Sequence, residues 1–286
     1  MADGVSIKTH AEEIQRGERF AFGANWLRFL KGLNDGTIQE AIHSLKTMLE
    51  VENLNGKTFL DIGSGSGLFS LAARYLGAKV VSFDYDPQSV ACTNELKNRY
   101  FTNDSNWQIQ SGSVLDRTYL NNLGKFDVVY SWGVLHHTGE MWTAMANIDQ
   151  NVAPGGKLFI ALYNDQGRPS KRWWSVKKAY VSLPNTMRWL VLVPCYVRLW
   201  GPTMVRDLIA LRPFSTWLSY KSNRGMSPHR DVIDWVGGFP FEVSKPEQIF
   251  DFYRNLGYSL LRLKTCAGGL GCNEFVFQKK RQDSSL

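Results

Sequence analysis

Three glycines alternate with serines in the segment LDIGSGSG, where they can bring backbone amides close to a ligand. Gly63, Gly65 and Gly67 follow a short apolar run that contains an acid, Asp61, and they precede a helical pattern. Glycine allows the tight turn, and the amides at the start of the next helix can donate to a polar group. A P-loop would need Lys and Ser or Thr after the last glycine, where Leu68 stands, and the dinucleotide fingerprint is GxGxxG. The spacing GxGxG therefore excludes both common nucleotide motifs.

Two acids stand about twenty residues further on, the distance at which a ribose-binding acid follows a glycine loop. Asp84 ends the apolar run KVVSFD, and Asp86 directly precedes Pro87. An acid at the end of the second strand can accept hydrogen bonds from two ribose hydroxyls, whereas either acid can instead cap a helix. Because proline suits the first position of a helix, we assign the cap to Asp86 and the ribose to Asp84.

Two adjacent histidines, His136 and His137, come soon after the apolar run FDVVYS. This position is at the carboxyl edge of the expected sheet, where doubly wound folds bind ligands. Histidine is the side chain best suited to take a proton near pH 7. Adjacent side chains diverge, so we expect one of the two, His136 before His137, to face an acceptor as general base. The alternative is a hydrogen-bonded structural role for both.

These residues need a sheet to bring them together, and apolar runs of strand length alternate with helical patterns along the chain. The expected strands are residues 57–62, 79–84, 107–111, 126–131, 157–162, 258–264 and 274–279. The expected helices lie within residues 10–50, with a break at 34–36, and at residues 67–76, 87–100, 141–151 and 246–256. The order predicts an α/β fold with a doubly wound, mostly parallel seven-stranded sheet that ends in an antiparallel C-terminal hairpin.

In this order and at these separations, the motifs resemble those of the class I S-adenosylmethionine-dependent methyltransferases, in their small-molecule, quinone-methylase-like branch. LDIGSGSG is similar to the family's first motif, FDYDP to its acidic second motif, and VAPGGKLFIA to its entry into the fifth strand. The resemblance covers residues 57–162 closely and the terminal hairpin loosely. It implies a Rossmann-like methyltransferase with S-adenosyl-L-methionine as cofactor and S-adenosyl-L-homocysteine as product.

The resemblance also implies which residues contact the cofactor. They are Asp61, Gly63, Ser64, Gly65 and Gly67 at the methionine, Asp84 at the ribose, Ser113 and Val114 at the adenine, and in addition Tyr85, Ser131 and Trp132. Ser113 stands where the family often has Asp, so adenine recognition falls to backbone amides or to the serine hydroxyl. No metal is expected, because the related quinone O-methyltransferases have Leu-Glu-His where this chain lacks the acid.

The methyl group of such a cofactor is already activated, so positioning does most of the catalytic work. The acceptor lone pair must lie in line with the S–CH₃ bond, about 3 Å away, with water excluded. Trp26 is a candidate acceptor contact that can also cover the cofactor, and the alternative is that it simply belongs to the core. Tyr163 and Asn164 leave the fifth strand at the active edge, so we expect them to contact the acceptor.

A basic, aromatic insertion, residues 163–240, separates the fifth strand from the C-terminal elements. Residues 163–231 contain twelve Lys and Arg but three Asp, and they account for the net charge of +7. Three interpretations stay open: a helical lid, a membrane-surface element through residues 173–217, and a nucleic-acid groove. The second depends on residues 188–200, an apolar stretch with Arg and Trp at both ends, in which we expect Pro194 to break a helix. The sequence has no recognised RNA-binding module, so a nucleic acid is the least favoured partner.

The composition is that of a globular protein, with 286 residues, 44% hydrophobic and 21% charged. The four cysteines lack CxxC spacing, and we find neither a secretory leader nor an apolar stretch of transmembrane length, which predicts a cytoplasmic protein that can be membrane-peripheral. We expect a helical cap (1–56), a cofactor core (57–162), the lid insertion (163–240), a helix and hairpin that complete the sheet (241–280), and a tail (281–286).

The predicted function is O-methylation of a small molecule: a glycan, a lipid-linked intermediate or a phenol. The positive charge also suits an anionic acceptor. The alternatives are an RNA methyltransferase and a catalytically silent scaffold that retains the cofactor fold. The sequence leaves the oligomeric state open.

Overall fold

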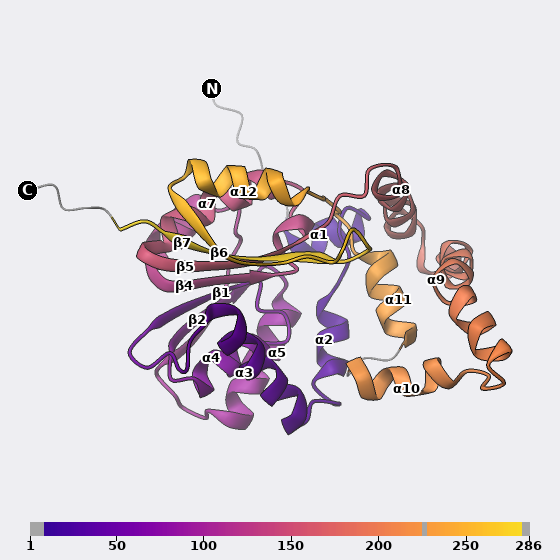
Figure 1. The fold of residues 1–286 in the computed structure, drawn as a ribbon, viewed down its shortest axis with the longest axis horizontal. Helices are drawn as coiled ribbons and strands as arrows, with labels where there is room; N and C mark the ends of the chain where they lie inside the picture. Colours follow the sequence, from indigo (N-terminus) through magenta and orange to yellow (C-terminus); the bar gives the residue numbers. More distant parts are fainter. Residues whose placement is uncertain (1–8, 225–227, 282–286) are drawn as a thin grey trace, which may run out of the picture. The chain divides into compact units, whose positions relative to one another are not determined.

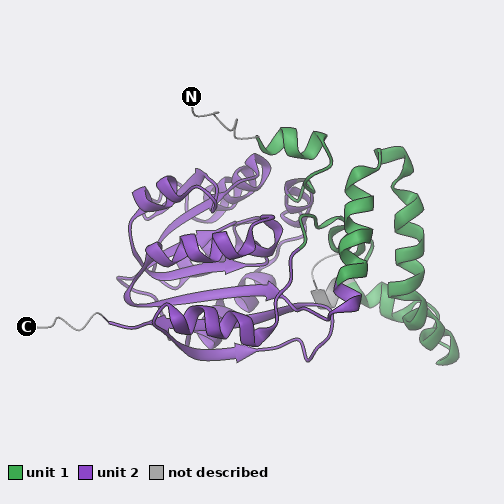
Figure 2. Cartoon of the chain, turned by 90° about the horizontal axis from the view of Figure 1, so that it is seen from above, with its two compact units in different colours: residues 1–22, 171–241 green, residues 23–170, 242–286 purple. Residues whose placement is uncertain are grey.

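The computed structural model describes residues 9–224 and 228–281. The chain forms two compact units, one of residues 1–22 and 171–241 and the other of residues 23–170 and 242–286 (Figure 2). We call them unit 1 and unit 2. The expected C-terminal tail lies outside the described residues except for residue 281, and residues 1–8 lie outside them too.

Unit 2 is built on a seven-stranded sheet in the order β3-β2-β1-β4-β5-β7-β6 (Figure 1). Its strands are β1 (Thr58–Ile62), β2 (Lys79–Asp84), β3 (Trp107–Ser111), β4 (Phe126–Trp132), β5 (Val152–Tyr163), β6 (Tyr258–Lys264) and β7 (Cys272–Lys279). The first five are parallel, and β7 runs antiparallel between β5 and β6. The predicted fold class, including the antiparallel C-terminal hairpin, is confirmed.

Helices cover both faces of this sheet. They are α2 (Gly23–Phe29), α3 (Asp35–Leu49), α4 (Leu68–Tyr75), α5 (Pro87–Tyr100), α6 (Arg117–Leu123), α7 (Met141–Ile148) and α12 (Pro246–Asn255). Side chains alternate along β1, so Phe59 packs into one core and Leu60 and Ile62 into the other. Asp61 therefore points to the same face as Phe59, toward α4. Of these helices, α6 has no counterpart in the prediction.

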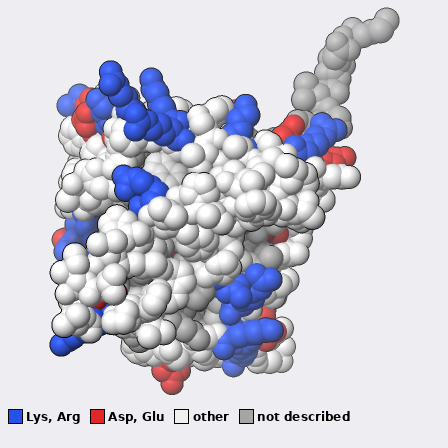
Figure 3. Space-filling view, turned by 90° about the vertical axis from the view of Figure 1, so that its right-hand side faces the viewer, with Lys and Arg blue, Asp and Glu red and all other residues white. Residues whose placement is uncertain are grey.

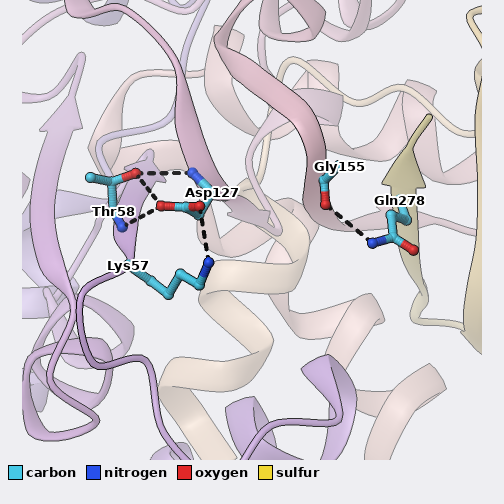
Figure 4. Close-up of polar contacts among 5 residues, drawn as sticks. All are labelled: Lys57, Thr58, Asp127, Gly155 and Gln278. Atoms are coloured by element: carbon cyan, nitrogen blue, oxygen red, sulfur yellow. Dashed lines mark hydrogen bonds and ion pairs between the residues drawn. The ribbon is translucent and has the colours of Figure 1, made fainter. Parts of the chain in front are cut away.

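A polar clamp fixes the strand register at the edge where β1 and β4 begin (Figure 4). The Asp127 carboxylate accepts hydrogen bonds from the backbone N–H and the hydroxyl of Thr58, both at 2.9 Å, and Lys57 Nζ lies 3.4 Å from it. Further along the sheet, Gln278 Nε2 donates to the carbonyl of Gly155 at 3.1 Å. Both contacts tie neighbouring strands at the edge opposite the glycine loop, so they serve the sheet and leave the other edge for ligands.

Unit 1 is helical and its core is rich in aromatic side chains. Its helices are α1 (His10–Gln15), α8 (Arg168–Ser182, which begins at the boundary with unit 2), α9 (Trp189–Ile209), α10 (Ser215–Arg224) and α11 (Pro228–Gly237). Trp200 packs edge-on against Trp217 and Tyr220, with ring centroids 4.6 and 5.2 Å apart. Within the described part of the chain, no helix combines the length and the apolar character that a membrane crossing requires.

The expectation that Pro194 breaks a helix is wrong, because α9 continues through Pro194 and Pro202. A proline inside a helix removes one hydrogen bond and crowds the preceding turn, which bends the helix more often than it ends it. Here the residues on both sides of Pro194 pack into the unit 1 core, among them Val191, Leu192 and Cys195. We infer that this packing offsets the cost of the proline.

Candidate cofactor and acceptor site

The carboxyl ends of the parallel strands gather the predicted site residues at one edge of the sheet. Asp61 pairs in register with Ser82 of β2, and Asp84, which ends β2, pairs with Ser111 at the end of β3. Trp132 ends β4 on the other side of β1. Since loops that leave a parallel sheet at this edge surround the ligand in doubly wound folds, the sequence motifs lie where such a ligand binds.

The glycine loop needs glycine for two separate reasons. Gly63, Gly65 and Gly67 all have positive φ, at 73°, 54° and 82°, a region that side chains with a Cβ rarely enter. A Cβ on Gly63 would also lie 2.4 Å from Val134, so the loop has no room for one there. The backbone amides of Gly63 and Ser64 donate to the Phe83 carbonyl at 2.9 and 3.1 Å, which joins the loop to β2.

Asp61 is buried beneath this loop in a chain of hydrogen bonds. Its Oδ2 accepts a 2.5 Å hydrogen bond from Ser70 Oγ in the first turn of α4, and the Ser70 hydroxyl also contacts Ser82 Oγ at 2.6 Å. Trp107 Nε1 donates to Ser82 Oγ at 2.9 Å. Burial raises the pKa of Asp61 to about 7, although the hydrogen bond from Ser70 acts to lower it. The carboxyl thus anchors the helix that follows the loop.

Asp84 joins the loop to the end of β2. Its Oδ2 accepts from the amide of Gly65 at 2.9 Å, and its Oδ1 accepts from the amide of Asp86 at 2.9 Å. Burial raises the pKa of Asp84 to about 6, although these backbone hydrogen bonds oppose the shift. A carboxylate can accept about four hydrogen bonds, so Asp84 keeps acceptor capacity for a ribose hydroxyl beside its backbone donors.

Asp86 caps α5, as the sequence predicts, and it also fixes α2. Its Oδ1 accepts from the amide of Gln88 at 2.8 Å, and its Oδ2 accepts from the amide of Gly23 at 2.8 Å. A Cβ on Gly23 would lie 2.6 Å from this carboxylate, so the close approach requires glycine. One turn later Trp26 lies over Gly65, where a Cβ would be 3.1 Å from the indole. Trp26 therefore covers the glycine loop.

The remaining predicted cofactor residues fall into different settings. Ser131 is fully buried, and its hydroxyl donates to the Ile62 carbonyl at 3.1 Å, so its side chain supports the sheet. The hydroxyl of Ser64 contacts Thr93 Oγ1 at 2.9 Å, and the hydroxyl of Ser113 accepts from the amide of Leu115 at 3.2 Å. Trp132 is exposed at the end of β4. The remaining two differ in burial: Val114 is buried and Tyr85, just after β2, is half-buried.

His136 and His137 form an aromatic cluster with Tyr163. They lie in the short 3-10 helix η1 (Leu135–His137) after β4, and the His136 ring is 3.9 Å from the Tyr163 ring. The His137 ring is 4.5 Å from that of His136 and stands perpendicular to Tyr163. His136 Nδ1 accepts from the Tyr163 amide at 3.3 Å, which assigns the neutral His136 ring a proton on Nε2. A neutral His136 is thus a hydrogen-bond donor at Nε2.

Glu242 is a residue of this region that the sequence analysis missed. Its carboxylate accepts from the amide of Met141 at 2.9 and 3.1 Å, and its own amide donates to the His136 carbonyl at 2.9 Å. Burial raises its pKa. Glu242 therefore joins η1, which carries the two histidines, to the first residue of α7. No local motif predicts that Glu242 contacts the histidine loop, because the whole insertion separates the two in the sequence.

Asn164 is engaged with the glycine-rich loop before β7. Its Oδ1 accepts from Asn273 Nδ2 at 3.1 Å, and its Nδ2 donates to the Gly269 carbonyl at 3.4 Å. Its amide group thus orders this loop next to the end of β5. Throughout the described ranges, 9–224 and 228–281, there is no cluster of three His, Cys, Asp or Glu side chains that could hold a metal ion.

The strand order, the antiparallel β7 and the glycine loop after β1 define the class I methyltransferase fold. The chain belongs to the methyltransferase domain family, whose model matches residues 34–191. S-adenosylmethionine is the methyl donor of this family, as the sequence resemblance implies. The predicted family and fold are therefore confirmed.

Three curated relatives each match only part of this chain, at most 39% of it. The ubiquinone biosynthesis O-methyltransferase of Nitrosococcus oceani is 32% identical over 114 residues, 39% of this chain and 46% of the relative. The tRNA U34 carboxymethyltransferase of Pseudoalteromonas translucida is 33% identical over 110 residues, 38% of this chain and 33% of the relative. The ribosomal protein L11 methyltransferase of Prochlorococcus marinus is 42% identical over 85 residues, which are 29% of this chain and 24% of the relative. Each match spans less than half of the relative.

Solved structures share the fold at low sequence identity. Magnesium protoporphyrin IX methyltransferase from Synechocystis PCC 6803, with bound S-adenosylhomocysteine, has a TM-score of 0.54 and 14% identity over 93% of this chain and 99% of its own. PKMT2 from Rickettsia typhi, in complex with S-adenosylhomocysteine, has a TM-score of 0.53 and 13% identity. The match covers 85% of this chain and 53% of the PKMT2 chain. At this identity the likeness concerns the fold.

Proposed function

We propose that this protein transfers the methyl group of S-adenosylmethionine to a hydroxyl of a small acceptor molecule. The observation that carries the proposal is the contact between Gly65 and Asp84, because it holds the glycine loop and the ribose acid side by side at the carboxyl edge of the sheet. In this proposal the loop, with Gly63, Ser64 and Gly67, binds the methionine part. Asp61 acts from below by fixing α4.

The rest of the cofactor falls to residues on the neighbouring strand ends. Asp84 and Tyr85 bind the ribose, and the backbone of Ser113 and Val114 binds the adenine. Trp132 lines the cofactor from β4, while Ser131 supports it only through the sheet. Trp26 covers the loop and keeps water from the sulfonium, which is the cofactor role that the sequence analysis offers for it.

For the reaction we propose different roles for the two histidines. The acceptor oxygen attacks the methyl carbon, the S–CH₃ bond breaks, and its electron pair leaves neutral S-adenosylhomocysteine. His137 takes the hydroxyl proton. His136, with its proton on Nε2, positions the acceptor by donating a hydrogen bond, and Tyr163 supports both rings. This assignment reverses the order expected from the sequence, and its basis is the hydrogen bond from Tyr163 to His136 Nδ1.

The proposal also names the class of the acceptor. The quinone O-methyltransferase relative supports a phenol, and the basic insertion suits an anionic or lipid-linked molecule. The tRNA-modifying relative, 33% identical over 110 residues, supports RNA as the second candidate. An RNA acceptor predicts binding that falls steeply with salt, whereas a small acceptor does not.

Calorimetric titration with S-adenosylhomocysteine tests the cofactor site. We expect micromolar binding by the wild type and by a Gln39→Ala variant of α3, far from the loop in sequence, as control. Absence of binding at millimolar ligand would contradict the proposal and favour a silent scaffold. Transfer of radiolabelled methyl groups to phenol, lipid, glycan and RNA fractions then identifies the acceptor.

Single substitutions of the histidines test the mechanism. General base catalysis contributes about 10²–10⁴-fold to the rate, so His137→Ala should lower kcat by that factor and remove the acidic limb of its pH profile. His136→Asn, which keeps a donor, should retain more activity than His136→Ala. Equal turnover of all three variants and the wild type would mean that positioning alone suffices.

A further inference from the structure

Helix α9 is apolar on two faces, and unit 1 uses only one of them. Cys195 and Trp200 face the core together with partly buried neighbours such as Leu192 and Leu199. The opposite side of the helix is exposed at Leu190, Val193, Val197, Val205 and Leu208. Their spacings of three, four, eight and three residues place them on one face. A helix that is apolar all round normally has apolar surroundings on every side.

The exposed apolar surface continues beyond the end of α9. Ile209 and Leu211 are 77% and 88% exposed, and Phe214 and Leu218 are exposed where α10 begins. Of the twenty large hydrophobic residues that are exposed in the described part of the chain, eleven lie within residues 187–218. We call this surface, residues 187–218, the α9–α10 face. Its size exceeds the scattered exposed side chains that a monomeric protein normally shows.

The turn between the two helices presents apolar side chains where glycine would be expected. Leu211 and Phe214 both have positive φ, 55° and 61°, in the left-handed region. A side chain with a Cβ is disfavoured there by roughly 1 kcal/mol or more. Unfavourable backbone conformations are retained mainly where the side chain has a use. The exposure of both side chains places that use outside the unit 1 core.

The charges of this face have a single sign. Residues 187–218 contain four arginines and one acid, Asp207. Asp207 is buried, where it accepts from the amide and the hydroxyl of Thr216, both at 2.8 Å. Arg198, Arg206 and Arg212 are exposed. Figure 3 shows this pattern on the side drawn at the right of Figure 1: a broad uncharged area, Lys and Arg around it, and few acids.

We propose that the α9–α10 face binds the surface of a membrane that contains anionic lipids. Apolar side chains enter the boundary between headgroups and acyl chains, and Trp189 at the start of α9 lies at the level of the headgroups. The arginines attract the lipid phosphates. The helix lies along the surface, which fits the finding that no described helix is suited to cross it. The proposal concerns a partner of unit 1 and does not depend on methyl transfer.

Vesicle flotation of the full chain tests this proposal without cofactor. We expect it to float with phosphatidylcholine vesicles that contain phosphatidylglycerol, and to bind pure phosphatidylcholine vesicles more weakly. The double variant Val197→Asp with Ile209→Asp should bind at least about tenfold more weakly, because two side chains of this size no longer leave water. Both positions are exposed, so circular dichroism should show an unchanged fold.

The matched control places the same charges on another exposed apolar site. Leu261 and Leu263 of β6 are 39% and 44% exposed, and Leu261→Asp with Leu263→Asp should bind vesicles like the wild type. Arg198→Ala and Arg212→Ala should each weaken binding to anionic vesicles by about fivefold, and salt should remove that difference.

Three results would overturn the proposal. The wild type could fail to float with anionic vesicles, or the β6 control could lose as much binding as the α9 variant. Light scattering could also show a dimer that Val197→Asp with Ile209→Asp converts to monomer, which would mean that a second copy of the chain covers this face.

Discussion

Each unit contains a buried ionisable group whose pKa burial shifts to about 7, and the two groups differ in charge and in the side chains that surround them. Asp61 of unit 2 is held by hydroxyls, with Ser70 as direct donor. Lys177 of unit 1 is fully buried, donates to the Trp235 carbonyl, and lies 4.2 and 4.7 Å from the rings of Trp235 and Phe241. Burial moves both pKa values to about 7, upward for Asp61 and downward for Lys177.

The difference shows how each unit tolerates a buried charge. Unit 2 gives its carboxyl a short chain of polar partners that also orders α4 and β2. Unit 1 surrounds its ammonium with aromatic faces, and Coulomb interactions with Cys195 and Asp234 oppose the lowering of its pKa by burial. In both, the neutral form is favoured by burial, so the two units should respond to pH in opposite directions.

The largest expected effect is this opposite pH dependence. Native Asp61 keeps its proton up to about pH 7 and the unfolded form releases it near 4, so the free energy of unfolding should fall as pH rises between them. Native Lys177 loses its proton at about 7, whereas the unfolded form keeps it to above 10, so the free energy should rise with pH in that window. Each shift corresponds to something on the order of 4 kcal/mol.

Urea denaturation from about pH 4 to about pH 10 measures both windows. Asp61→Asn keeps an acceptor for Ser70 and should make the fall in the free energy of unfolding between about pH 4 and 7, the acidic window, less steep, with the part due to Asp84 remaining. Lys177→Met keeps the side-chain volume and should flatten only the alkaline window. If either variant changed the other window, the two buried groups would not be independent.

Asp84 extends the comparison to the ligand site. Its pKa is also raised by burial, but it lies at the carboxyl end of β2, where we propose that the ribose binds. Asp84→Ala should weaken S-adenosylhomocysteine binding by about 1–3 kcal/mol through the loss of charged hydrogen bonds. In the wild type, affinity should also fall as pH drops through about 6, where the carboxyl gains a proton. Calorimetry at several pH values measures both. An affinity that Asp84→Ala leaves unchanged would refute the ribose assignment.

Ser70 tests the polar support of Asp61 directly. Ser70→Ala removes the hydroxyl that joins Asp61 to Ser82, and it should lower the free energy of unfolding by about 1–2 kcal/mol. It should also raise the pKa of Asp61 further, which extends the acidic window of the urea experiment upward. Ser219→Ala on the surface of α10 is a control that should leave both unchanged. A pKa that stays in place would mean that Ser70 does not support the carboxyl.

Substitution of Gly65 has the smallest expected effect on stability. It separates the cost of a positive φ from the cost of a steric contact with Trp26. Gly65→Ala should destabilise the protein by about 1 kcal/mol through its positive φ, plus the movement of Trp26. Gly257→Ala is the matched control, since its φ is also positive and nothing lies within 4 Å of an added Cβ. Thermal unfolding compares the two. If both variants lose the same stability, Trp26 moves away from the new methyl group at no cost. If Gly65→Ala loses more, the surrounding residues hold the Trp26 indole in place over the glycine loop.

The sequence predicted much of unit 2, because its signals are local. Apolar runs mark β1, β2, β4 and β5, and the acid before Pro87 marks the start of α5. The face of the sheet to which the Asp61 side chain points can also be predicted from the sequence, since alternation along β1 places it on the same face as Phe59. Short α6 gave no apolar periodicity and was missed.

Unit 1 and the histidine loop were harder to predict for a physical reason. The helix α9 is apolar on both faces, so its pattern carries no single stripe, and proline rules suggest a break that packing overcomes. The hydrogen bond that selects the His136 tautomer comes from the backbone of Tyr163, which any residue type there could provide. Glu242 reaches the histidine loop across the whole insertion, and no local spacing reports such a contact.

The position of β7 has a consequence for synthesis on the ribosome. β5 pairs with β7 on one side, and residues 164–271 must be made between them. At roughly 5–20 residues per second, the apolar edge of β5 waits on the order of ten seconds for its partner. Residues 171–241 of unit 1 are translated during this interval, and residues 1–22 are made before it, so unit 1 has time to fold first. Meanwhile the nascent sheet has an open edge, the kind of site at which chains aggregate.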